Sequence, residues 1–290
     1  MDAASIAKPE LAYRYEFAPA ELDAMLECVN GHGFAVLKSV LPRDTVAELQ
    51  AAVLEAVDPG GELRDGQSRT HLSFVEAAPA AHKLLEYEPF MRIHRFLNHS
   101  EALTVHRTAA IVRRPGSAPV AWHSDWRGFS TAPPKDASDI LNRGPWLSGK
   151  WFYLTGSRPV HGGLCVIEDS HVDGWEGPDG FTLTAEGNSF YPSGTEPRRY
   201  DGFDVPGLVP LFTDPGDMIL FAHRTFHAAF PNRTDQVRLS CALGFRPKRY
   251  KIEAPWPLPP AARALVAALP AHLQPFVDEY TGIDPQWRAA

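Results

Sequence analysis

A histidine and an aspartate separated by one residue, His123 and Asp125, are well suited to bind a metal. On a β-strand, side chains alternate between faces with a period of two, so both would point to the same side. A second histidine, His227, follows the apolar run 218–221 far along the chain. Two histidines and one carboxylate form a facial triad, which leaves metal positions open and suits Fe(II) and oxygen chemistry.

The His-x-Asp pair alone is a weak signal, because the chain contains 12 histidines and 35 acidic residues. The segment 236–243 strengthens it. There Arg238 and Ser240 alternate with apolar residues, namely Val237, Leu239, Cys241 and Leu243. Arg238 and Ser240 would therefore share the face opposite the apolar core. A buried arginine needs a partner, and its planar guanidinium fits the carboxylate of a co-substrate. An internal salt bridge to Asp or Glu is the alternative.

Several segments, in order along the chain, resemble the phytanoyl-CoA dioxygenase family of Fe(II)/2-oxoglutarate oxygenases. The resemblance covers roughly residues 15–250. It departs from the family at Glu168-Asp169, where the family usually has Pro-Gly, and this puts the local turn in doubt. The segments that carry the resemblance are 33–37, 41–46, His123-Ser124-Asp125, 162–171, Pro215-Gly216-Asp217, His227, Pro231-Asn232 and Arg238.

The resemblance implies a mainly β fold with flanking helices, a double-stranded β-helix or cupin-like jelly roll. We expect one oxygenase domain over 1–290, with a core at about 15–250 and a C-terminal helical extension at 251–290. It also implies Fe(II) as cofactor, with 2-oxoglutarate and O2 as co-substrates.

The resemblance further implies roles for individual residues. His123, Asp125 and His227 would be the catalytic metal ligands. His223 competes for the third position, but the eleven residues between His227 and Arg238 match the family spacing. Arg238 would bind the distal carboxylate of 2-oxoglutarate, with Ser240 as a second donor.

Two further residues are candidates for co-substrate contact. Trp151 stands at a spacing where some family members place a tryptophan against 2-oxoglutarate, and a core aromatic is the alternative. His71 lies in a stretch that corresponds loosely to a ligand-contacting strand, and a solvated loop over 62–76 is the alternative.

The implied reaction is hydroxylation of an unactivated C–H bond in a small molecule, with release of succinate and CO2. A halogenase would need a small residue in place of Asp125, so halogenation is disfavoured. A zinc-dependent hydrolase could use the same three ligands and an activated water, although Arg238 would then have no role. A non-catalytic small-molecule-binding protein on the same fold is a further alternative.

The elements that must position these residues follow from periodicity and from turn residues. We expect helices that begin at Pro19 and Pro42, a helical stretch over 80–99 and two short helices over 261–280. We expect strands at 34–37, 103–112, 150–154, 164–167, 218–221 and 236–245, with 103–112 beside the His-x-Asp strand. Residues 127–148 are either a lid or an insertion, and 172–207 are an insertion that carries substrate specificity. The basic cluster 246–251 either binds an anion or is a solvated segment.

Composition narrows the class of protein. A net charge of -7 disfavours nucleic-acid binding, and no apolar run is long enough to span a membrane. Cys28, Cys165 and Cys241 stand at no metal-binding spacing, so we interpret them as buried thiols in a reducing compartment. We therefore expect a cytoplasmic monomer or homodimer that acts on a small molecule.

Overall fold

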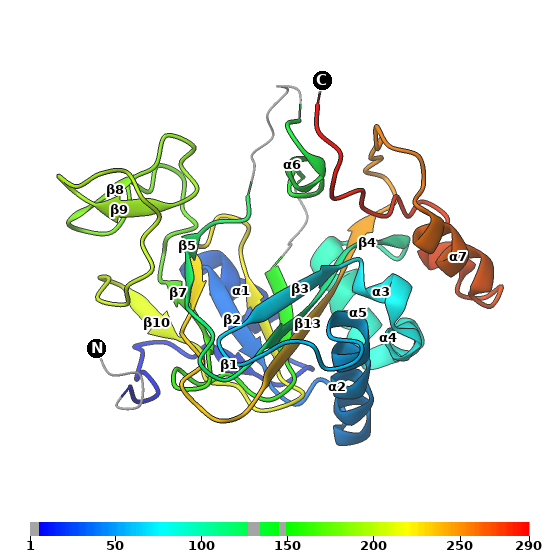
Figure 1. Ribbon diagram of the computed structural model, residues 1–290, viewed down its shortest axis with the longest axis horizontal. Coiled ribbons are helices and arrows are strands. Elements are labelled where there is room, and N and C mark those ends of the chain that lie inside the picture. The colour runs from blue at the N-terminus through cyan, green and yellow to red at the C-terminus, as the bar shows by residue number, and fades with distance from the viewer. Residues whose placement is uncertain (1–5, 127–133, 145–148, 290) are drawn as a thin grey trace.

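The computed structural model describes residues 6–126, 134–144 and 149–289 (Figure 1). Its strands form a seven-stranded sheet in the order β1-β2-β11-β6-β13-β4-β3 and a four-stranded sheet in the order β10-β7-β12-β5. Neighbouring strands are antiparallel except for β1 and β2. The larger sheet contains β1 (Glu16–Phe17), β2 (Phe34–Leu37), β3 (Ser68–Leu72), β4 (Leu103–Arg113), β6 (Gly149–Tyr153), β11 (Met218–Phe221) and β13 (Arg238–Pro247). The smaller sheet contains β5 (Val120–His123), β7 (Leu164–Ile167), β10 (Leu208–Pro210) and β12 (His227–Ala229).

The two sheets pack face to face without closing into a barrel. Leu164 and Val166 of β7 belong to the same buried cluster as Ile219 of β11 in the larger sheet. The predicted jelly-roll architecture with flanking helices is confirmed, and it places a protected interior between the sheets.

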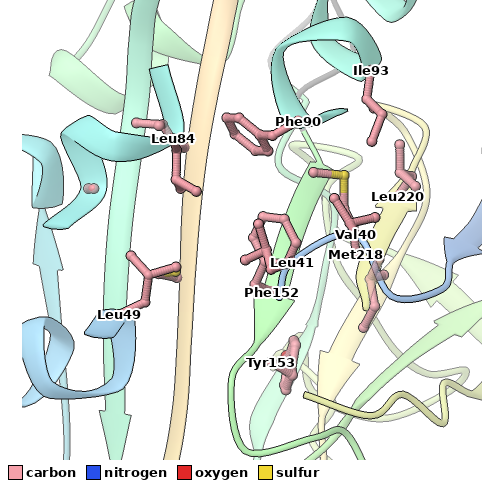
Figure 2. Close-up of a cluster of buried hydrophobic side chains, with 14 of the residues drawn as sticks. Val40, Leu41, Leu49, Leu84, Phe90, Ile93, Phe152, Tyr153, Met218 and Leu220 are labelled. Carbon is pink, nitrogen blue, oxygen red and sulfur yellow. The ribbon is translucent and has the colours of Figure 1, made fainter. Parts of the chain in front are cut away.

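Helices cover the outer face of the larger sheet. Figure 2 shows Phe90 of α5 near Phe152 of β6, and Leu49 of α2 belongs to the same buried cluster. The helical elements are α1 (Leu22–His32), α2 (Arg43–Val57), α3 (Phe74–Ala77), α4 (Pro79–His82), η2 (Lys83–Leu85), α5 (Glu88–Asn98), α6 (Ala137–Leu141), α7 (Pro260–Ala268) and η3 (Gln274–Phe276). Because helices cover one face of the larger sheet, only the opposite face of that sheet can face the smaller sheet.

The first helix, α1, begins at Leu22, three residues after the predicted start at Pro19, and ends at a glycine. Leu22, Met25 and Val29 form the buried stripe of α1, and Gly33 closes it with a left-handed φ of 84°. A Cβ at this position would lie 2.8 Å from His171 Nδ1, so glycine is required for space as well as for conformation. The turn leads directly into β2, which pairs with β11.

Strand β13 shows the predicted alternation. Leu239, Cys241, Leu243 and Phe245 belong to the core cluster beneath the helices. Arg238 and Ser240 therefore face the interior between the sheets. Ala242 and Gly244 follow along the strand, and their small size leaves room beside Arg238 and Ser240.

Two expectations about strands were wrong. Of the two interpretations of 62–76, the solvated loop is wrong for 68–72, because these residues form β3 and all of them pair with β4. The strand 103–113 does not lie beside the His-x-Asp strand. It lies between β13 and β3 in the larger sheet, whereas β5 pairs with β12 in the smaller one.

The structure describes the predicted insertion 172–207 in full and the segment 127–148 in part. The 172–207 insertion forms a hairpin of β8 (Phe181–Leu183) and β9 (Phe190–Pro192), which packs on the outer face of the smaller sheet through Phe190 and Trp122. Of the 127–148 segment, 127–133 and 145–148 lie outside the described residues, so the lid hypothesis concerns only α6 and its flanks.

The basic cluster 246–251 has a structural role that neither sequence interpretation included. Lys248 pairs with Asp278 at 2.7 Å, and both Arg246 and Lys251 pair with Glu279. The cluster therefore fixes the C-terminal segment onto the end of β13.

Two predictions from composition can be compared with the structure. The three cysteines are free and buried, as predicted. None of the helices in residues 6–126, 134–144 and 149–289 combines the length and apolar character needed to cross a bilayer.

Candidate metal centre

His123, Asp125 and His227 meet at the rim of the smaller sheet. His227 of β12 lies directly opposite His123 of β5 in the strand register, and their ring centroids are 4.3 Å apart. Asp125 follows β5 by two residues, and its Oδ1 atom lies 3.9 Å from His123 Nε2. One potential ligand atom from each of the three residues lies within 4.8 Å of the others.

Backbone carbonyls orient both imidazole rings for metal binding. His123 Nδ1 lies 2.8 Å from the carbonyl oxygen of Ala121, and His227 Nδ1 lies 3.1 Å from that of Thr225. Since a carbonyl only accepts, each Nδ1 must carry the proton, which leaves the Nε2 lone pair for a metal. Burial lowers the pKa of His227 to about 4, and the neighbouring His123 adds to this effect, so His227 is neutral near pH 7.

Arg238 lies in the interior with a guanidinium that lacks a carboxylate partner among the described residues. Its side chain is 1% exposed, and its Nη1 donates to Ser240 Oγ at 2.6 Å. The guanidinium carbon lies 4.7 Å from the ring centroid of Tyr153, and Nε has no hydrogen-bond partner within the described structure. The internal salt bridge considered from the sequence is therefore absent from the described residues, and a carboxylate ligand would satisfy this cation.

Trp151 and His71, the two other predicted co-substrate contacts, lie on opposite faces of the larger sheet. Trp151 alternates with Lys150 and Phe152 on β6, so it faces the interior, and it lines a small cavity together with Asp125. His71 pairs with Ala110, a core residue on the helix-covered face of β4. Paired residues share a face, so the structure does not bring His71 to Arg238.

A cavity of about 960 Å³ adjoins the three candidate ligands. It is lined by Ser124 and Trp126, which flank Asp125, and by Phe226, which precedes His227. The hairpin β8–β9 and the segment around α6 contribute the outer walls. The charged lining residues are Lys135, Asp136, Asp139, Arg143, Glu186, Arg199 and Arg224. A cavity of this volume accommodates a sizeable small molecule.

The family model for phytanoyl-CoA dioxygenase (PhyH) matches residues 29–240. The chain belongs to this family. The family consists of Fe(II)/2-oxoglutarate oxygenases that consume O2, so the chain has a dioxygenase-type function with these cofactors. The triad and Arg238 lie within the matched region, and their residue types suit that chemistry.

Solved structures of similar fold support the architecture of this PhyH-family chain. The epimerase SnoN, in complex with Fe3+, alpha ketoglutarate and nogalamycin RO, gives a TM-score of 0.58 at 20% identity, covering 94% of this chain and 95% of that one. HygX from Streptomyces hygroscopicus, with nickel and 2-oxoglutarate bound, gives a TM-score of 0.54 at 19% identity, covering 79% of this chain and 88% of that one. EctD from S. alaskensis, with 2-oxoglutarate and 5-hydroxyectoine, gives a TM-score of 0.57 at 20% identity, covering 82% of this chain and 80% of that one. A search of curated protein sequences finds no match to this chain.

Two arginines near the site were missed in the sequence of this PhyH-family chain. Arg113 lies opposite Arg238 in the β4–β13 register, and Arg107 lies 3.9 Å from Asp125 Oδ2. Both are charged residues within or at the end of the apolar strand 103–113. Arg113 directly follows the apolar residues 109–112, a signal that the strand carries it into the interior, whereas the position of Arg107 depends on a local irregularity of the strand.

Proposed function

We propose that this protein is an Fe(II)/2-oxoglutarate-dependent dioxygenase that hydroxylates an unactivated C–H bond of a small molecule. His123, Asp125 and His227 would hold the metal, and Arg238 would bind the distal carboxylate of 2-oxoglutarate, with Ser240 orienting the guanidinium. The bound Fe(II) and 2-oxoglutarate would supply oxygen activation coupled to decarboxylation. The observation that carries the proposal is the combination of the triad with a fully buried arginine that lacks a carboxylate partner among the described residues.

The residues around the ligands support a protected oxidation site. Phe221 packs 4.5 Å from the His227 ring, and Trp151 and Tyr153 form the interior wall along β6. These aromatic groups would limit access of water to the metal and keep the reaction on the bound substrate. The co-substrate would occupy the space beside the small residues of β13.

The large cavity is the proposed substrate site. Its wall combines Trp126, Trp175 and Phe226 with charged groups of both signs. We infer a substrate that has both polar and apolar parts. The 172–207 insertion would then determine specificity, because Trp175 and the β8–β9 hairpin belong to it.

The zinc-hydrolase alternative makes a different prediction. A hydrolase would not consume 2-oxoglutarate, and it would leave Arg238 buried without a function. The purified protein should be incubated with Fe(II), 2-oxoglutarate and O2, with and without a panel of small molecules, and succinate should be measured. Succinate that requires both Fe(II) and 2-oxoglutarate supports the proposal, and a substrate that raises its rate would be a candidate. Under 18O2, one labelled oxygen should enter succinate and one should enter the hydroxylated product.

Cytoplasmic localisation and a monomeric or homodimeric state remain our proposals for the protein in the cell. The single-domain organisation over residues 1–290 is likewise a proposal. The ion pairs of 246–251 with Asp278 and Glu279 support it, because they hold the C-terminal extension against the sheet.

A further inference from the structure

Strand β4 contains a β-bulge next to the metal centre. Val105 pairs with Phe245 and Thr108 pairs with Leu243, so His106 and Arg107 together oppose the single residue Gly244. Bulges re-aim side chains and occur next to active sites. A Cβ at position 244 would lie 2.8 Å from the carbonyl oxygen of Arg107, so only glycine accommodates the bulged backbone.

The bulge directs both of its side chains toward the same cavity, which Asp125 also lines. Arg107 Nη1 lies 3.9 Å from Asp125 Oδ2. Asp125 Oδ1 is the atom that faces His123 Nε2. The two oxygens of the carboxylate are therefore distinguished, with Oδ1 toward the candidate metal position and Oδ2 toward Arg107.

The same two bulge residues hold the end of α6. His106 Nε2 lies 2.8 Å from the carbonyl oxygen of Leu141 and donates to it, because a carbonyl only accepts. Arg107 Nη1 donates to Asn142 Oδ1. One guanidinium thus joins the carboxylate of the triad to the segment that carries α6.

That segment also forms part of the large cavity. Lys135, Asp136, Asp139 and Arg143 line the cavity from α6 and its flanks. The C-terminal residues reinforce the segment, since Arg288 forms a β-bridge with Asp136 and Ala289 N donates to Lys135 O at 3.1 Å. Figure 1 shows the C-terminus close to α6. The wall of the cavity is therefore connected to Asp125 through Arg107.

We propose that Arg107 is a positioning residue for the metal carboxylate. It holds Asp125 Oδ2 so that Oδ1 is presented to the metal, and it couples this orientation to the α6 segment at the substrate cavity. The inference rests on the proposed function. Partners that orient a ligating side chain commonly contribute about 10- to 100-fold to metal affinity, and Arg107 occupies such a position.

The test is the anaerobic dissociation constant for Fe(II), measured on metal-free protein by calorimetry. Arg107→Gln removes the charge and keeps much of the side-chain length. We expect it to raise the dissociation constant about 10-fold and to shift the visible charge-transfer band that forms with Fe(II) and 2-oxoglutarate. Arg95→Gln is the matched control, because Arg95 of α5 pairs with Glu88 of the same helix and with Glu101 just after it, and it does not contact the ligands.

A second variant keeps the test decisive if Arg107→Gln does not fold. Asn142→Ala removes the hydrogen-bond acceptor that directly follows α6 and leaves the Arg107 charge in place, and we expect a smaller increase in the same dissociation constant. Arg107→Lys should recover part of the affinity, because it restores a cation without the branched guanidinium. The inference is overturned if the folded variants bind Fe(II) as tightly as the wild type and give an unshifted band. A wild-type protein that forms no band would instead contradict the proposed function.

Discussion

Arg113 and Arg238 lie directly opposite each other across β4 and β13, and each is 1% exposed. Arg113 donates to the carbonyl oxygens of Ala118 and Gly162, and Arg238 donates to Ser240. Burial, followed by the charge of Arg238, lowers the pKa of Arg113 to about 9. No carboxylate pairs with either cation within the described part of the chain. The interior between the sheets therefore holds two positive charges that a bound anion would neutralise.

We therefore predict that 2-oxoglutarate stabilises the metal-loaded protein. A ligand at 100 times its dissociation constant adds about 2.7 kcal/mol to the free energy of unfolding. For a chain of 290 residues, that corresponds to a rise in Tm of roughly 4–5 °C. Thermal unfolding with the redox-inert metal Ni(II) measures the effect without turnover. Pyruvate keeps the 2-oxo acid group but lacks the distal carboxylate, so it should stabilise much less. Equal rises in Tm with the two acids would show that the arginine pair does not bind the distal carboxylate.

Substitution of Arg238 should weaken co-substrate binding specifically. Arg238→Met removes the guanidinium and keeps an unbranched apolar side chain in the interior. Loss of charge-assisted hydrogen bonds worth about 3 kcal/mol in total would raise the dissociation constant for 2-oxoglutarate about 100-fold. Anaerobic titration of the Fe(II)-loaded protein gives this constant. Arg263→Met, at an exposed position on α7, should leave it unchanged. An unchanged constant in Arg238→Met would place the distal carboxylate elsewhere.

His227 and His223 provide a matched pair for the third ligand. His227 belongs to the triad, and its Nδ1 bonds the carbonyl oxygen of Thr225. His227→Ala should lower Fe(II) affinity by about 100-fold or more, because loss of a ligand costs more than loss of a residue that orients one. His223→Ala should bind Fe(II) within a few-fold of the wild type. Calorimetric titration under nitrogen compares the two variants. Loss of binding in His223→Ala with retention in His227→Ala would reverse the assignment.

Lys150 should limit stability at neutral pH. It lies on the same side of β6 as Phe152, which packs 6.0 Å from Phe90 of α5, and its amine has no partner within the described structure. Burial lowers the pKa of Lys150 to about 7. The unfolded chain, with a lysine pKa near 10.4, then binds more protons than the folded chain between about pH 7 and 10. Stability should therefore rise with pH across this window, by at most about 4 kcal/mol from this group.

Lys150→Met tests that expectation. The variant should be more stable than the wild type at pH 7, and its free energy of unfolding should depend less on pH between 7 and 10. Urea unfolding at several pH values measures both effects. Lys83→Met is the control, because Lys83 is exposed and pairs with Glu48. A wild-type protein whose stability falls over this window would contradict the buried neutral amine.

Local sequence patterns were sufficient to predict much of the fold. The buried stripes of α1 and α2 and the alternation in β13 are carried by consecutive residues, so their periodicity identified them. The grouping of His123, Asp125 and His227 was also predicted, because residue type and family spacing restrict the possible ligands. The helices and β13 depend on local periodicity, whereas the pairing of His227 with His123 and Asp125 over about a hundred residues came from the resemblance to the family.

Long-range pairing explains what the sequence did not predict. Strand β3 has a polar sequence and is held at the sheet edge by backbone pairing with β4, so it lacks an apolar period. The neighbours of β4 and the bulge at Arg107 depend on which strand it pairs with. The partners of the 246–251 cluster, Asp278 and Glu279, lie about thirty residues further along the chain. In each case the deciding contact lies outside the local pattern.

The central claim is most directly tested by the anaerobic visible spectrum of the protein with Fe(II) and 2-oxoglutarate. We predict a weak metal-to-ligand charge-transfer band in the wild type. The band should be absent in His227→Ala, and it should require about 100-fold more 2-oxoglutarate in Arg238→Met. A wild-type protein that binds zinc tightly but forms no band with Fe(II) and 2-oxoglutarate would contradict the assignment of the triad and of Arg238.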